Sequence, residues 1–85
     1  MDAGALKEIS GSGLVNSIEF DNYGQFLLSG SGKGVKVHAL VSKQWEEAYA
    51  NEELHEGVVN VARFAPNGRV IVTGSDDRFM KVLTL

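Results

Sequence analysis

The fold is decided by residues 58–83, which read VVNVARFAPNGRVIVTGSDDRFMKVL. The segment consists of short runs rich in β-branched and aromatic side chains, and such runs favour strands. Ala65-Pro66-Asn67-Gly68 between the first two runs has the chemistry of a tight turn, because proline presets φ and Asn-Gly tolerates positive φ. The polar residues 75–78 separate the second run from the third. The segment therefore predicts three short strands joined by tight turns, at 58–64, 70–74 and 79–83.

The same pattern occurs once before in the chain. VNSIEF at 15–20 corresponds to VNVARF at 59–64, and Gly30-Ser31 corresponds to Gly74-Ser75, in both cases 44 residues later. Beyond this point the offset becomes 45 residues, so the loop between has gained or lost one residue. A period of about 40–45 residues with a few strands per unit is typical of propeller blades.

The first repeat predicts four strands, and the last of them is ambiguous. Trp45, Ala48 and Tyr49 lie at helical spacing, but the repeat places the outer strand of a blade at 44–49, and we expect context to override propensity. A single strand over 5–9 precedes the repeat. The prediction is an all-β fold of about two four-stranded blades, with the strands out of phase as one, four and three. The corresponding units are 1–13, an outer strand of a preceding blade with its loop; 14–50, the first blade; and 51–85, the second blade without its outer strand.

Composition excludes several classes of function. The formal net charge of −3 over 85 residues argues against non-specific binding to nucleic acid or to an anionic membrane. There is no cysteine, and no apolar run approaches the roughly 20 residues of a membrane-spanning helix. We expect an intracellular protein that makes no direct contact with nucleic acid or membrane.

Four segments of the chain resemble motifs of the WD-repeat β-propeller family. Residues 54–59 are similar to its Gly-His loop and first strand, and residues 64–68 to its Phe-Ser-Pro-Asp-Gly turn. Residues 73–77 and 80–83 are similar to the segment that ends in the family's Trp. The resemblance implies a propeller fragment, whose neighbours are other blades of the same propeller or further copies of this chain.

The resemblance also implies a structural role for three polar residues. In the family a His, a Ser or Thr, an Asp and the Trp form a buried hydrogen-bonded set that locks each blade. His55, Thr73 and Asp77 match this set, and Leu83 replaces the Trp. In the first repeat Gly11 stands at the His position and His38 at the Trp position, so we expect this softer blade to rest on apolar packing alone.

The sequence predicts no catalytic residue, no cofactor and no metal site. Gly30-Ser31-Gly32-Lys33-Gly34 lacks the spacing and the following helix of a phosphate-binding loop. An enzyme would need a nucleophile, a base and an orienting group together, and no such set is present. We therefore expect a binding protein, whose candidate partner-binding residues are aromatic or basic: Trp45, Tyr49, Lys33, Arg69 and Arg78.

Within the family, Lys43-Gln44-Trp45 and the missing Trp of both repeats resemble the C-terminal blades of spliceosomal scaffolds that are also U-box ubiquitin ligases. This resemblance implies a nuclear scaffold in pre-mRNA splicing that binds spliceosomal or ligase-complex components, or substrates of the ligase. The U-box of that group has no counterpart here, so ligase activity is not carried over to this chain. The alternative is a small repeat protein whose copies assemble into a closed ring.

Overall fold

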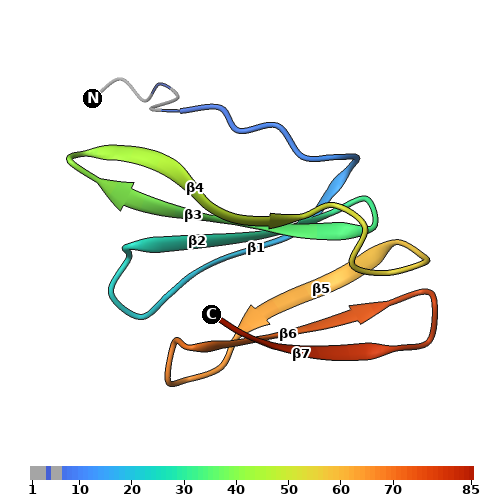
Figure 1. Ribbon diagram of the computed structural model, residues 1–85. Coiled ribbons are helices and arrows are strands. Elements are labelled where there is room, and N and C mark those ends of the chain that lie inside the picture. The colour runs from blue at the N-terminus through green and yellow to red at the C-terminus, as the bar shows by residue number, and fades with distance from the viewer. Residues whose placement is uncertain (1–3, 5–6) are drawn as a thin grey trace.

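The described part of the chain forms an all-β structure, as the sequence predicts. The structure is a computed structural model that describes residue 4 and residues 7–85. Two antiparallel sheets have the strand orders β1-β2-β3-β4 and β5-β6-β7 (Figure 1). We refer to them as sheet 1 and sheet 2. The strands are β1 (Val15–Phe20), β2 (Phe26–Ser31), β3 (Gly34–Val41), β4 (Gln44–Asn51), β5 (Val59–Phe64), β6 (Val70–Ser75) and β7 (Met80–Thr84).

The ambiguous segment after residue 43 is a strand. β4 pairs with β3 along its length, with Trp45 opposite Leu40 and one irregularity between Val37 and His38. Ser42 and Lys43 between the two strands have φ of 50° and 67°, which fits a two-residue hairpin loop with positive φ at both positions. Pairing with β3 therefore overrides the helical spacing of this segment.

The expected single strand over 5–9 stays a prediction. Residues 5 and 6 lie outside the described residues, and residues 7–10 are not assigned to a strand. An outer strand of a preceding blade pairs with that blade, and the described residues contain no such sheet.

The two repeats share backbone details. β1 has a register irregularity between Val15 and Ser17, and β5 has one between Val59 and Val61, 44 residues later. Gly24 and Gly68 have positive φ of 70° and 71° at equivalent turns. The repeat in the sequence is therefore a repeat in backbone conformation.

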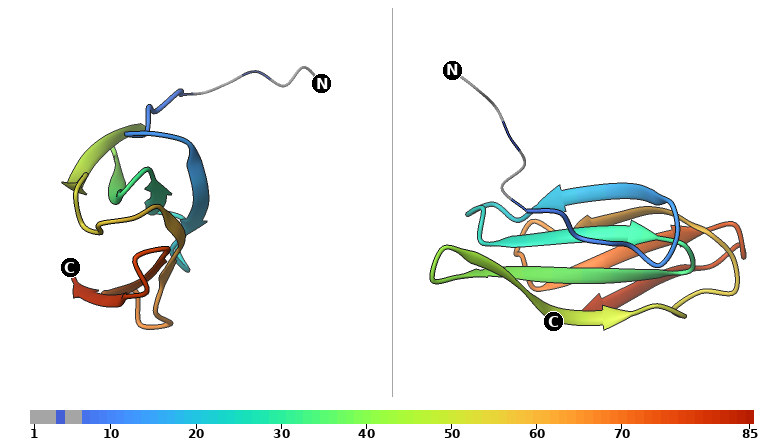
Figure 2. Two further views of the ribbon diagram at one scale, coloured as in Figure 1. Left: turned by 90° about the vertical axis from the view of Figure 1, so that its right-hand side faces the viewer. Right: turned by 90° about the horizontal axis from the view of Figure 1, so that it is seen from above.

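The core lies between the two sheets, where β5 packs against β1 and β2 (Figure 2). Sheet 1 contributes Leu28, Val35 and Val37, which are at most 2% exposed, and sheet 2 contributes Ala62 and Ile71, which are fully buried. Burial of these apolar side chains is the main force that holds one sheet against the other. The described residues include no helix long and apolar enough to cross a membrane.

Each sheet has a second face that is open. Ile18 and Phe20 on sheet 1 are 63% and 56% exposed, and Val82 on sheet 2 is 68% exposed. Exposed apolar faces of this kind mark places where further protein packs.

Candidate functional site

The side chains of His55, Thr73 and Asp77 meet beside sheet 2. His55 lies in the connection before β5, Thr73 on β6 and Asp77 in the turn after β6. The Nδ1 atom of His55 lies 2.9 Å from Oδ2 of Asp77, and its Nε2 atom lies 2.6 Å from Oγ1 of Thr73. An ionised carboxylate only accepts, so Nδ1–H donates to Asp77, and in the neutral imidazole Nε2 then accepts the hydroxyl proton of Thr73. The His55 side chain is fully buried and both ring nitrogens are used within the fold. This arrangement holds the imidazole in one tautomer and one orientation.

Asp77 connects two loops at one end of the sheets. Its Oδ2 atom also accepts the backbone N–H of Glu56 at 3.0 Å, and its Oδ1 atom accepts that of Phe79 at 2.8 Å. Although desolvation opposes the shift, these N–H groups and His55 lower the pKa of Asp77 from 3.8 to about 2. The carboxylate thereby ties the β4–β5 connection to the β6–β7 turn.

The lowered pKa of Asp77 makes stability depend on pH. A carboxyl group whose pKa is lower in the folded chain stabilises the fold when ionised, above pH 3.8, and loses this contribution as pH falls from 3.8 toward about 2. We expect the melting temperature of the wild type to fall more steeply between about pH 5 and pH 2 than that of Asp77→Asn, whose amide does not titrate in this range. Melting curves followed by circular dichroism test this, and parallel pH profiles would contradict it.

The first repeat does not rest on apolar packing alone, so that expectation is wrong. The Oγ atom of Ser31 accepts the backbone N–H of Ser12 at 3.0 Å, and the Ser12 hydroxyl donates to the Ser31 carbonyl at 3.2 Å. A Cβ at Gly11 would meet Ser31 Oγ at 2.5 Å, so glycine is needed for this close approach. A small serine pair thus replaces the histidine set.

His38 and Leu83 stand at the Trp positions of the two repeats. His38 is 7% exposed, and burial lowers its pKa below the ordinary value, with Lys36 and Lys7 acting in the same direction and Glu47 against it. Leu83 is partly buried against the core between the sheets. Both side chains therefore contribute to packing inside the fold.

A set of side chains on β1 binds the free backbone edge of β5, and the sequence analysis did not predict it. Ser17 Oγ accepts the N–H of Ala62 at 3.1 Å and donates to the Ala62 carbonyl at 3.0 Å. Glu19 Oε1 accepts the N–H of Phe64 at 2.6 Å, and Asn16 Nδ2 donates to the Val59 carbonyl at 3.2 Å. We call Asn16, Ser17 and Glu19 the clasp.

The clasp replaces the strand partner that β5 lacks on this side. Each satisfied backbone group avoids a desolvation penalty of about 1–3 kcal/mol. Glu19 also lies 3.4 Å from Arg63, and Asn22 donates to the Pro66 carbonyl at 3.0 Å, so contacts continue into the turns. The sequence feature that could have revealed the clasp is the spacing of Ser17 and Glu19, two residues apart on β1. This strand is the innermost strand of its sheet, at the edge opposite the outer strand β4. The second repeat has Val61 and Arg63 at the equivalent positions.

The candidate partner-binding residues do not form one surface. Lys33 and Arg78 lie in the turns after β2 and β6, at one end of the sheets, whereas Arg69 lies in a turn at the opposite end (Figure 1). Tyr49 lies on β4 beside an apolar hollow that Phe26 and Leu85 also line.

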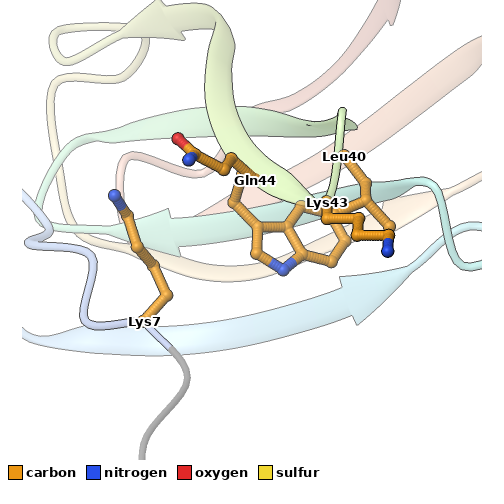
Figure 3. Close-up of a pocket in the computed structure, with 5 residues that line it drawn as sticks. Lys7, Leu40, Lys43 and Gln44 are labelled. Carbon is orange, nitrogen blue, oxygen red and sulfur yellow. The ribbon is translucent and has the colours of Figure 1, made fainter.

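Trp45 lies in an open pocket at the same end as Arg69. The pocket has a volume of about 560 Å³, and Lys7 and Lys43 flank it from two sides (Figure 3). The Trp45 ring packs against Phe20 with their centroids 5.8 Å apart. The pocket therefore presents a supported aromatic ring and two ammonium groups, and its lining residues are Lys7, Leu40, Lys43, Gln44 and Trp45.

Comparison with known proteins assigns these sheets to a family. Residues 5–38 and 51–82 match the model of the WD domain, G-beta repeat family (WD40). The chain is also similar to Pre-mRNA-processing factor 19 of Caenorhabditis elegans, with 39% identity over 70 residues. The matched region is 82% of this chain and 13% of that relative, so the chain spans a small part of the relative's length. The first match covers β1, β2 and most of β3, the second covers β5, β6 and most of β7, and the chain belongs to the WD domain, G-beta repeat family.

Proposed function

We propose that this chain is part of a protein-interaction scaffold that acts in pre-mRNA splicing in the nucleus. Repeats of this family build rigid sheets for protein partners, and the name of the similar C. elegans protein supports splicing. The observation that carries the proposal is the 39% identity to that protein over 70 residues, which are 82% of this chain. In this proposal residues 14–50 and 51–85 are two blades, residues 1–13 belong to a preceding blade, and the partners are spliceosomal components.

Recognition by such a scaffold depends on fixed shape. The inter-sheet core, the clasp and the His55 set hold the turns at both ends of the sheets. In this proposal the Trp45 pocket is the main contact, because supported aromatic rings dominate binding energy at interfaces. Its two lysines favour an acidic partner segment.

Co-purification tests the proposed function. The tagged chain, expressed in cells of its source organism, is expected to enrich spliceosomal proteins and small nuclear RNAs over a tag-only control. We expect Trp45→Ala to weaken this enrichment by about tenfold, as loss of an aromatic anchor does. Tyr23→Ala is the matched control, because Tyr23 is 88% exposed in the turn after β1 and does not line the pocket.

The outcomes distinguish the proposed role in splicing from the proposed role of the Trp45 pocket. Absence of spliceosomal components, together with normal splicing after depletion of the protein, would contradict a role in splicing. Equal enrichment by Trp45→Ala and Tyr23→Ala would contradict the assignment of the pocket alone.

A further inference from the structure

The open edge of β1 is equivalent to the clasped edge of β5. On β5 the bound backbone groups belong to Val59, Ala62 and Phe64. The 44-residue repeat makes Val15, Ile18 and Phe20 their equivalents on β1, and both strands carry the same register irregularity. The N–H groups of Ile18 and Phe20 therefore point away from β2, toward the side on which β1 is the edge of its sheet.

We propose that this edge of β1 receives the innermost strand of another sheet, one that carries a Ser or Thr and, two residues later, a Glu, Asp, Gln or Asn. Such a strand repeats the chemistry of Ser17 and Glu19, whose oxygens accept the N–H groups of β5. The hydroxyl accepts from Ile18 N–H and donates to its carbonyl. The side-chain oxygen of the residue two positions later accepts the N–H of Phe20.

The exposed side chains beside this edge fit the same partner. Ile18 and Phe20 are 63% and 56% exposed, whereas their equivalents Ala62 and Phe64 face sheet 1. A sheet seated on this face covers apolar surface while its clasp satisfies the edge. The occupant is therefore a blade-like sheet with an apolar face and a polar innermost strand.

A second copy of this chain does not supply such a strand. Its β1 clasp is already used on its own β5, and the equivalent positions on β5 are Val61 and Arg63. Valine has no polar side-chain atom, and the guanidinium group of arginine only donates hydrogen bonds. Neither can accept from Ile18 or Phe20, so the ring of identical copies lacks the contact that joins the two sheets within the chain.

The test introduces a clasp on β5, the strand of sheet 2 that lacks one. Val61→Thr with Arg63→Gln places a hydroxyl and an amide oxygen two residues apart on β5. Glutamine is chosen because a carboxylate at 63 would lie beside Glu19, which is 3.4 Å from Arg63. Both positions lie on the open face of sheet 2, where Val61 is 39% exposed, so folding is expected to be retained.

We expect the double variant to self-associate about tenfold more tightly than the wild type, the change that a few net hydrogen bonds give. Sedimentation equilibrium of the full 85-residue chains measures this, with circular dichroism as the check on folding. Val61→Thr alone is the second variant, and it is expected to show a smaller gain. Adding Ile18→Pro to the double variant removes one bonded N–H at a strand edge, where proline is tolerated, and should return association to the wild-type level.

Three outcomes would overturn the proposal: equal association of the wild type and the double variant, no effect of Ile18→Pro, or a discrete closed ring of the wild type. The inference concerns which sheet β1 accepts and is independent of the role in splicing. Its failure would leave the co-purification result unaffected.

Discussion

Replacing His55 with alanine is expected to lower the free energy of unfolding by about 2–4 kcal/mol, a large part of the stability of a small domain. The fully buried imidazole leaves a cavity, and the Thr73 hydroxyl loses its acceptor. The Asp77 carboxylate also loses its side-chain donor. Urea unfolding followed by circular dichroism at pH 7 measures the change.

Lys33→Ala is the matched control for this variant. Lys33 is exposed at the same end of the sheets, and its contact with His55 is made by its backbone carbonyl, which accepts the His55 N–H at 2.9 Å. A His55→Ala chain as stable as Lys33→Ala would show that the buried set does not hold sheet 2 together.

Replacing two of the three clasp residues is expected to lower the stability of the fold. The double variant Ser17→Ala, Glu19→Ala leaves the backbone groups of Ala62 and Phe64 without their side-chain partners, at a cost of about 2–4 kcal/mol in total. Urea unfolding measures the loss. The matched control is Glu46→Ala, because Glu46 is an exposed carboxylate on β4.

This variant is also expected to weaken the coupling of the sheets. In the wild type one unfolding transition should report both sheets, since β5 packs on β1 and β2. In the clasp variant sheet 2 is expected to unfold at a lower urea concentration than sheet 1. The same stability in the clasp variant and in Glu46→Ala would contradict a joining role for Ser17 and Glu19.

The sequence was sufficient to predict the strands of both repeats. Short β-branched runs and turns such as Asn67-Gly68 are local signals, and the 44-residue offset placed the same signals twice. The strand after residue 43 required the repeat as context, because Trp45 and Tyr49 alone favour a helix. Local chemistry and internal repetition thus determine the architecture.

The candidate site was predictable only in part. The resemblance to the family brought His55, Thr73 and Asp77 together, since each lies at a motif position. The clasp was missed because Ser17 and Glu19 look like solvent-facing residues of a strand until the position of β5 is known. The Ser12–Ser31 pair was missed because Gly11 stands at the histidine position, so the family motif predicts no buried polar contact in the first repeat. Contacts between sheets depend on tertiary placement, which no local pattern encodes.

Amide hydrogen exchange of the wild-type chain, measured residue by residue with NMR, tests the central claim that side chains of the first repeat complete the edge of the second. The account predicts slow exchange at Ala62 and Phe64, whose N–H groups bind Ser17 and Glu19, and fast exchange at their equivalents Ile18 and Phe20 on the open edge of β1. Fast exchange at Ala62 and Phe64, at the rate of Ile18 and Phe20, would contradict it.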